Sequence, residues 1–181
     1  MTARIPLPEV HAAPHGSKIS LDQIQTAFGG VPNMFRAVSN SPAALQSMWG
    51  AFGALGGGVI PAQLGEKIAV AVADRNRCEY CLAAHTALGR KAGASVIDMA
   101  TAQAGKSDDP KTAAALAFAL KLVDARGQAD DADIGRLREV GFSDEEIVEI
   151  LAHVALNLFT NYVNVAFHVP VDFPTVKLLP R

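Results

Sequence analysis

Segment 66–93 most constrains how this chain folds, because it has the pattern of two helices joined by one polar turn. Its first part, EKIAVAVA, is apolar at every position from 68 to 73, as expected of a helix buried on nearly every side. Pro61 is well placed for the first turn of that helix, the polar residues 74–77 end it, and Gly93 ends the next one. The segment therefore predicts a buried helical hairpin.

The second part of this segment contains the only two cysteines of the sequence. Cys78 and Cys81 are three residues apart and His85 follows four residues later, so a helix that begins near Arg77 places all three on one narrow stripe. Neighbours at i and i+3 are about 5–6 Å apart, which allows a disulfide, and the amide-rich end of the helix favours a thiolate. We expect a CxxC at the N-terminal end of a helix.

Glu66 adds a carboxylate to this group. It lies on an otherwise apolar helix, where a carboxylate needs a partner or a raised pKa. If the chain turns back at residues 74–77, His85 and the two cysteines are the candidate partners. The four side chains together make a candidate thiol–disulfide site with its own proton relay.

The pattern Glu66-x11-Cys78-x2-Cys81-x3-His85 resembles the active-site signature of alkylhydroperoxidase D-like proteins in the carboxymuconolactone decarboxylase superfamily. The fifth signature position, a histidine just before the second cysteine in alkylhydroperoxidase D, is Tyr80 here, so the relay is expected to be shorter. The resemblance is sharpest over residues 45–105 and looser in the C-terminal helix, which is similar to that of larger peroxidase-related members. It implies a compact all-α helical bundle that assembles into dimers, trimers or hexamers.

The resemblance also implies an activity, that of a thiol-dependent peroxidase or disulfide reductase with an antioxidant role. One thiolate attacks the O–O bond of a hydroperoxide and becomes a sulfenic acid, and the other cysteine condenses with it to a disulfide. An external dithiol, of lipoyl type by resemblance, restores the pair. No metal, haem or other cofactor is expected.

Two arguments disagree on which cysteine attacks the peroxide. The helix dipole and the arginines at positions 75 and 77 favour Cys78, whereas the resembling family uses the second cysteine. His85 lies one turn beyond Cys81 and can take its proton, and Glu66 can orient the imidazole or receive that proton. We therefore predict Cys81 as the peroxidatic cysteine, Cys78 as the resolving cysteine, and His85 with Glu66 as the relay.

Other sites and functions compete with this interpretation. A zinc site would have three ligands in the CxxC and His85, but it lacks a second CxxC or a further histidine pair, so Glu66 would have to complete the set. A c-type haem needs histidine where Leu82 stands, and a thioredoxin-like fold needs a strand before the CxxC. Two buried structural cysteines are a further alternative, which the charged neighbours of Cys78 disfavour. A carboxymuconolactone decarboxylase-type lyase and a non-enzymatic redox sensor remain as alternative functions.

Helical patterns with short connections fill the rest of the chain, and no segment alternates with period two over strand length, so the fold is predicted to be all-α. Ser20 is predicted to cap a helix that ends at the glycines 29 and 30. Further helices are expected over 33–38, 43–55, 94–104, 110–126 and 130–140. Ser143 and Glu146 form a capping box for the last helix, 144–167.

The last helix carries polar residues close to one stripe, namely His153, Asn157, Asn161, Asn164 and His168. Buried polar groups need hydrogen-bond partners, so we expect these side chains to bond at a subunit contact or within the fold. His153 and Asn157, with Tyr80, are candidate pocket residues, and a structural role is preferred to a catalytic one.

Composition limits the remaining possibilities. With 181 residues, half of them hydrophobic, the chain can bury one core, so we expect a single domain over 1–181 with an extended N-terminal arm at 1–19. A net charge of −2 without a long basic run indicates neither a nucleic-acid partner nor an anionic membrane. We find no signal-peptide pattern and expect no membrane-spanning run, which predicts a cytoplasmic protein. In a reducing compartment a lone cysteine pair is more often catalytic or metal-binding than structural.

Overall fold

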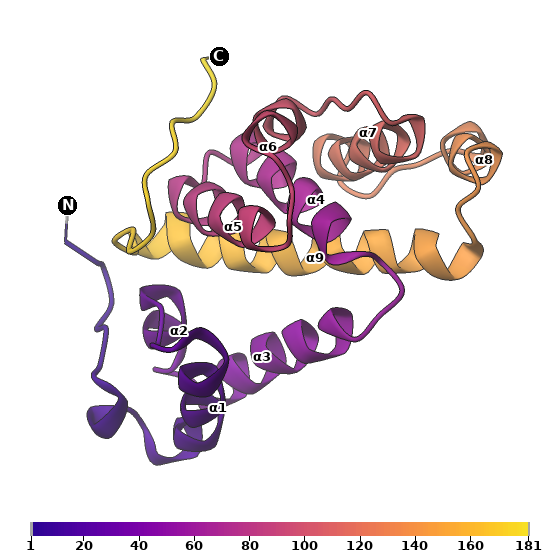
Figure 1. Cartoon of the computed structure of the whole chain (residues 1–181). Coiled ribbons are helices and arrows are strands. Elements are labelled where there is room, and N and C mark those ends of the chain that lie inside the picture. The colour runs from indigo at the N-terminus through magenta and orange to yellow at the C-terminus, as the bar shows by residue number, and fades with distance from the viewer. Residues whose placement is uncertain (1, 181) are drawn as a thin grey trace.

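The structure, a computed structural model, describes residues 2–180, and these residues form helices and loops without any strand (Figure 1). The all-α prediction is confirmed. In chain order the elements are η1 (Val10–Ala12), η2 (His15–Ser17), α1 (Lys18–Phe28), α2 (Asn33–Val38), α3 (Pro42–Gly56), α4 (Ala62–Arg75), α5 (Glu79–Lys91), α6 (Val96–Gln103), α7 (Pro110–Asp124), α8 (Asp131–Glu139) and α9 (Asp144–Phe167).

The helix α4 lies at the centre of the fold. Every residue from 68 to 73 is buried, and α4 packs against α5, α6, α7 and α9. Three alanines in this stretch allow the neighbouring helices to approach closely, while the valines and Ile68 fill the space between them. The chain then turns back into α5, so the predicted helical hairpin is present and brings Glu66 beside the second half of the segment.

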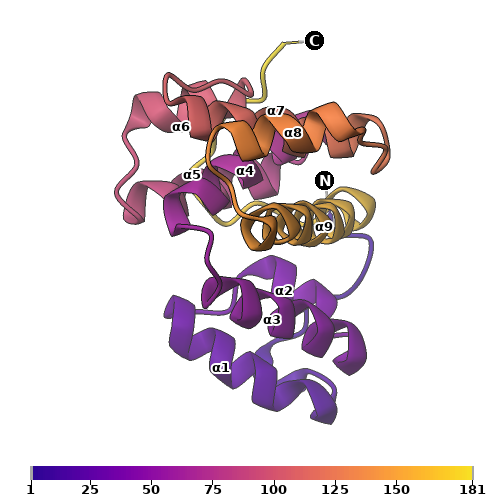
Figure 2. The same ribbon diagram turned by 90° about the vertical axis from the view of Figure 1, so that its right-hand side faces the viewer.

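The helix α9 lies between two layers of helices. Figure 2 shows α1, α2 and α3 on one side of it and α4 to α8 on the other. The predicted capping box is present at its start: Ser143 Oγ accepts from the Glu146 N–H, and the Glu146 carboxylate accepts from the Ser143 N–H. At its other end His168 adopts a left-handed conformation with φ of 50°. This helix therefore presents one side to the cysteine hairpin along much of its length.

Within the described residues, α9 is also the one helix long and apolar enough, by length and composition, to cross a membrane. The expectation that the sequence contains no such run is therefore wrong on those two criteria. In the fold, however, α9 packs against six other helices and buries asparagines at 157, 161 and 164. Its contacts are those of a core helix in a globular bundle.

The N-terminal layer begins earlier than predicted. The helix α1 starts at Lys18 with Ser17 as its N-cap, and Ser20 is buried inside the helix, so the predicted cap at Ser20 is wrong. A short 3-10 turn leads directly into α1, and Ser17 Oγ donates to the Ser39 carbonyl rather than capping the helix. The arm before it follows the surface of its own chain, where Arg36 donates to two of its carbonyls.

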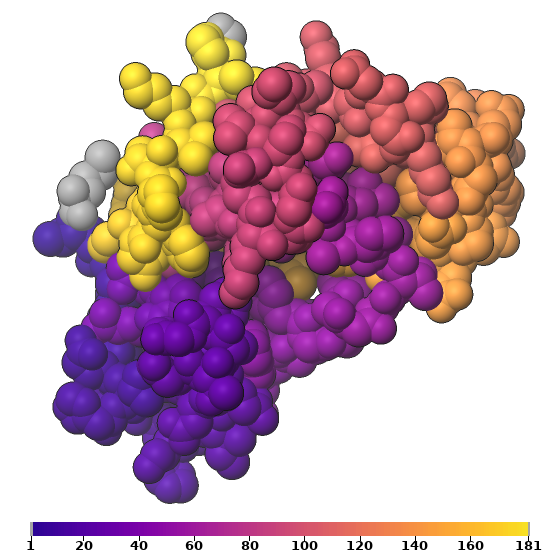
Figure 3. Space-filling model, viewed as in Figure 1, coloured from indigo at the N-terminus to yellow at the C-terminus, as the bar shows by residue number. Residues whose placement is uncertain are grey.

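The C-terminal tail, residues 169–180, is irregular and returns to the α4–α5 hairpin. The N–H of Leu179 donates to Asp74 Oδ1 at 2.9 Å, and Arg77 donates to the Leu179 carbonyl at 2.7 Å. In the space-filling view this tail covers one end of the hairpin, while a hollow with α9 at its floor opens between α3 and the hairpin (Figure 3). The hairpin is thus covered at one end and open on one side.

Candidate active site

Cys78 is the N-cap of α5, one residue before the helix begins. Arg77 adopts a left-handed conformation with φ of 58°, which turns the chain sharply out of α4 and is strained for a residue other than glycine. The sulfur of Cys78 then accepts a hydrogen bond from the Cys81 N–H at 3.3 Å. Cys78 therefore fills the place that a serine or aspartate oxygen usually takes at a helix start.

Cys81 lies in the first turn of α5 and is covered by α9. The side-chain amide of Asn164 donates to the Cys81 sulfur, with 3.1 Å between Nδ2 and Sγ. Thr160 Oγ1 is 3.9 Å from the same sulfur, and the Thr160 hydroxyl donates to the Asn157 carbonyl. Cys78 and Cys81 are only 1% and 2% exposed, and both are free cysteines.

Glu66 and His85 form the second half of the site. Glu66 projects from α4 and His85 from α5, and 2.7 Å separates Glu66 Oε2 from His85 Nδ1. No hydrogen bond joins His85 to either cysteine, all three being described residues. Instead, His85 and Cys81 share the wall of a small space of about 30 Å³, which we call the thiol cavity. A space of this size can hold a water molecule or a reacting oxygen between them.

The electrostatics of the relay favour a charged imidazole. Burial disfavours the protonated form of His85, but the charge of Glu66 and its hydrogen bond outweigh burial and raise the pKa of His85. His85 is therefore a source of positive charge near the sulfurs.

The two cysteines titrate in opposite directions. Burial disfavours the Cys81 thiolate, but a hydrogen bond from the Cys78 thiol, the charge of His85 and the Asn164 amide outweigh burial and lower the pKa of Cys81 to about 6. This bond between the two side chains, in which Cys78 keeps its proton, raises the pKa of Cys78 together with burial. Near neutral pH the site therefore pairs a Cys81 thiolate with a Cys78 thiol.

The two arginines expected to activate Cys78 are used elsewhere. Arg75 forms an ion pair with Asp124 at the end of α7. Arg77 donates to the Leu179 carbonyl and lies 3.9 Å from Asp74 Oδ2, so its charge is partly neutralised. The sequence argument that these charges favour Cys78 is wrong for this reason.

Two larger spaces flank the thiol cavity. The first, the Cys78 cleft, has a volume of about 370 Å³ and is lined by Arg77, Cys78, Tyr80, Asn164, His168 and the start of the tail. The second, the relay cavity, has about 160 Å³ and corresponds to the hollow beside α3. Its apolar walls come from α3, α4 and α9, and its polar wall contains Glu66, His85, His153, Asn157 and Thr160. Cys78 thus lines the Cys78 cleft, whereas Cys81 lines the thiol cavity.

The candidate pocket residues of α9 lie in the relay cavity. Burial lowers the pKa of His153 despite the nearby charge of Glu149, so its imidazole is neutral, and its Nε2 has no hydrogen-bond partner in the described structure. Asn157 donates to the His153 carbonyl in its own helix at 2.9 Å. These two residues line the cavity without contacting the cysteines.

Comparison with known proteins agrees with this geometry. The sequence profile of the carboxymuconolactone decarboxylase family matches residues 42–125, which include Glu66, both cysteines and His85. A crystal structure described as the core of alkylhydroperoxidase AhpD, an uncharacterized peroxidase-related protein from Ralstonia eutropha JMP134, has 29% identity and a TM-score of 0.83 over 94% of this chain and 92% of that one. Residues 42–125 are a carboxymuconolactone decarboxylase family region, and the chain has an alkylhydroperoxidase D-like fold.

Two further structures share the fold. A peroxidase-related protein from Silicibacter sp. TM1040 has 25% identity and a TM-score of 0.80, with 93% of this chain and 91% of that chain covered. The debrominase Bmp8 has 22% identity and a TM-score of 0.79, with 95% of this chain and 93% of that chain covered. No curated protein sequence matches significantly. Proteins that share this fold are therefore named for different activities.

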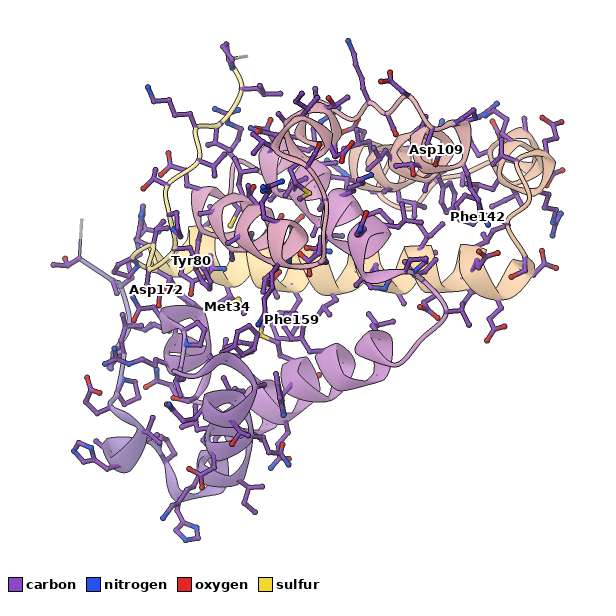
Figure 4. The ribbon with its side chains drawn as sticks, viewed as in Figure 1. Met34, Tyr80, Asp109, Phe142, Phe159 and Asp172 are labelled. Carbon is purple, nitrogen blue, oxygen red and sulfur yellow. The ribbon has the colours of Figure 1, made fainter. Side chains whose placement is uncertain are left out.

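Tyr80 marks the departure from the alkylhydroperoxidase D signature. Its hydroxyl accepts a hydrogen bond from the Met34 N–H at 3.2 Å, and its ring packs edge-on against Phe173. Figure 4 shows Tyr80, Met34 and Asp172 gathered at the N-terminal end of α5. Burial raises the pKa of Tyr80, so its phenol stays protonated. In this alkylhydroperoxidase D-like protein the position joins the hairpin to α2 and borders both the Cys78 cleft and the thiol cavity.

Sequence reasoning missed the two residues of α9 that contact Cys81. Asn164 belonged to the predicted polar stripe without any assigned link to the cysteines, and Thr160 was not singled out. The stripe itself was the available signal, because a buried asparagine needs a partner. Among residues 2–180, no three side chains of His, Cys, Asp or Glu are arranged to hold a metal ion.

Proposed function

We propose that this protein is a thiol-dependent peroxidase that reduces hydroperoxides through Cys81 and Cys78. The observation that carries the proposal is the asymmetry of the pair: Cys81 accepts the Asn164 amide and shares a cavity with the Glu66-bound His85, and its pKa is lowered to about 6, whereas the pKa of Cys78 is raised. A thiolate is the nucleophilic form of cysteine, and an imidazolium can protonate a leaving oxygen. The lowered pKa of Cys81 and the raised pKa of His85 favour these two forms.

The first step consumes the peroxide. The Cys81 thiolate attacks one peroxide oxygen, an S–O bond forms and the O–O bond breaks, and the leaving alkoxide takes a proton from His85. The products are a Cys81 sulfenic acid and an alcohol, or water when the substrate is hydrogen peroxide. Glu66 holds the imidazole by its Nδ1, which leaves the other ring nitrogen for this transfer.

The second step closes the disulfide. The Cys78 sulfur attacks the Cys81 sulfur, an S–S bond forms, and the S–O bond breaks. The departing hydroxide leaves as water with the proton of Cys78. The two residues are adjacent on one helix turn, so this step needs little movement. Peroxide is reduced by two electrons, and both come from the cysteine pair.

We assign the reduction of the disulfide to an external dithiol of lipoyl type, which enters through the Cys78 cleft. Cys78 lines this cleft, whereas the thiol cavity beside Cys81 is too small for such a molecule. Attack on Cys78 releases Cys81 as the leaving group, and a thiol of low pKa leaves faster. The cytoplasm, where such dithiols are kept reduced, is the proposed location.

A steady-state assay of peroxide consumption tests this proposal. With a dithiol reductant we expect sustained turnover, and with a monothiol a much slower reaction. Because a debrominase shares the fold, the assay also offers a brominated pyrrole, and a carboxymuconolactone tests the lyase alternative. Bromide release or decarboxylation without peroxide consumption would replace the proposal, and disulfide formation without any turnover would indicate a redox sensor. Stoichiometric zinc in the purified protein would favour the zinc alternative.

We further propose that the protein self-associates through α9. Apolar side chains on this helix remain exposed, among them Val148, Leu151, Tyr162 and Val165. Beside Tyr162, an apolar groove of about 570 Å³ runs between α9 and the helices α2 and α3, where Figure 4 shows Phe159. A second copy offers a matching apolar face, as in a two-fold interface.

Light scattering tests this self-association. The wild type should have a mass that is a multiple of 19.0 kDa, and Tyr162→Glu should have the mass of the monomer. A monomeric wild type would refute the idea.

A further inference from the structure

We propose that Asn164 directs the negative charge of the cysteine pair to Cys81 rather than to Cys78. The starting point is that the local backbone favours the other outcome. Cys78 stands at the N-cap of α5, where the helix dipole is most favourable for an anion, and its sulfur already accepts the Cys81 N–H. His85 opposes this preference from the same helix, and the one side-chain donor that reaches Cys81 from another helix is Asn164.

Two side chains of α9 contact the Cys81 sulfur, Asn164 and Thr160, and they differ in whether they donate a hydrogen bond to it. Thr160 donates its hydroxyl proton to the Asn157 carbonyl, so toward the sulfur it presents an oxygen at 3.9 Å. Asn164 presents an N–H at 3.1 Å, which suits a thiolate. Asn164 is only 4% exposed, so water does not compete strongly for this donor.

The other hydrogen-bonding group of Asn164 indicates a role at the sulfur rather than in the framework. Its Oδ1 is buried and has no partner among the described residues, so the amide is not anchored to the fold at that end. Asn161, one turn earlier, accepts from Asn76 at 3.0 Å, and Asn157 donates to a backbone carbonyl. Those two amides bond the framework, whereas the hydrogen bond of Asn164 goes to Cys81.

The titratable groups that face Cys81 are few and are held in place. Cys78 and His85 belong to its own helix, Glu66 reaches it from α4 through His85, and the Tyr80 phenol stays protonated. The face of α9 at this point supplies amide and hydroxyl groups rather than charges. Removing the Asn164 amide therefore changes one neutral donor and leaves every charged neighbour present.

The inference rests on the proposed function only for the identity of the nucleophile, and its test needs no peroxide. Thiolate absorbance in the ultraviolet is followed against pH for the reduced wild type and for Asn164→Leu, whose side chain is of similar size. Loss of this hydrogen bond to the charged thiolate should raise the titration midpoint of Cys81 from about 6 by roughly one to two pH units. Asn161→Leu is the matched control, because it removes a buried α9 amide that does not contact sulfur, and its midpoint should stay near that of the wild type.

The position of the charge is read by limited alkylation and mass spectrometry of peptide 78–90, which trypsin releases between Arg77 and Lys91. We expect label mainly on Cys81 in the wild type and a larger share on Cys78 in Asn164→Leu. Should Asn164→Leu fail to fold, Asn164→Ala takes its place with the same expectation. An unmoved midpoint with label still on Cys81, or an equal shift in Asn161→Leu, overturns the inference. A protein that lacks peroxidase activity but shows the Asn164 effect contradicts the proposed function alone.

Discussion

Cys78 and Cys81 occupy the same helix end, but their surroundings differ in the properties that govern thiol chemistry. Cys78 faces an open cleft of about 370 Å³, and Cys81 faces a thiol cavity of about 30 Å³. The sulfur of Cys78 accepts a backbone N–H, and that of Cys81 accepts a side-chain amide from a helix more than 80 residues later in the chain. The pKa of Cys78 is raised and the pKa of Cys81 is lowered.

This comparison shows that the position of a cysteine on a helix does not decide its reactivity by itself. The helix dipole favours the N-cap residue, but it is spread over several exposed N–H groups, whereas His85 and Asn164 act on one sulfur at short range. Burial of Cys81 strengthens these short-range interactions because water screens them less. The open cleft leaves Cys78 for the larger reactant, the dithiol.

The largest expected effect comes from replacing each of the two cysteines with serine in turn. Cys81→Ser should reduce peroxide consumption to background, because it removes the thiolate. Cys78→Ser should still consume about one equivalent of peroxide and then stop, since no resolving sulfur remains. Stopped-flow measurement with stoichiometric peroxide separates a single event from turnover. A full loss in Cys78→Ser with a burst in Cys81→Ser would reverse the two roles.

The relay variants should have the next largest effect. His85→Ala and Glu66→Gln should slow turnover by about 10²–10⁴-fold, the usual contribution of general acid–base assistance, without unfolding the protein. Glu145→Gln, at an exposed glutamate in the first turn of α9, is the control and should leave the rate unchanged. A loss below tenfold in both relay variants would mean that the Glu66–His85 pair is structural.

The pH dependence tests how the charge of Glu66 reaches Cys81. Glu66 raises the pKa of His85, and the resulting imidazolium lowers the pKa of Cys81. The reactive thiolate should therefore be lost in the wild type as the pH falls through about 6, and in Glu66→Gln the loss should begin at a higher pH. Alkylation rates of the reduced protein across this range measure both midpoints. Identical midpoints would show that Glu66 does not act on the thiolate.

Tyr80 should have the smallest effect on activity. Tyr80→Phe keeps the ring against Phe173 but leaves the buried Met34 N–H without its acceptor, which should cost about 1–3 kcal/mol of unfolding free energy. Turnover should change less than in the relay variants, because the phenol stays protonated. Denaturant unfolding and the peroxide assay give the two quantities. A loss of turnover as large as that of His85→Ala would place Tyr80 in the relay.

Much of the fold could be predicted from local patterns. The apolar run before Asp74 predicted a buried helix, and Ser143 with Glu146 predicted the start of α9, because both signals depend on residues a few positions apart. The predicted start of the first helix is three residues late, since Ser20 and Ser17 are equally plausible caps in sequence. Only the turn that precedes Lys18 distinguishes them.

The candidate site could be predicted less completely. The spacing of Glu66, Cys78, Cys81 and His85 indicated the group, and the Glu66 and His85 side chains are in contact. The Asn164 contact and the pairing of Arg75 with Asp124 depend on how distant helices are aligned along one another. Periodicity identifies the face of a helix but not its position relative to a neighbour that lies far away in the chain.

Trapping the sulfenic acid in each single-cysteine variant tests the central claim most directly. Reduced Cys78→Ser and Cys81→Ser are treated with one equivalent of peroxide and a sulfenic-acid probe, and the adduct is measured on peptide 78–90 by mass spectrometry. We expect a stable adduct on Cys81 in Cys78→Ser and little or none on Cys78 in Cys81→Ser. An adduct in Cys81→Ser but not in Cys78→Ser would contradict the assignment of Cys81 as the cysteine that attacks the peroxide.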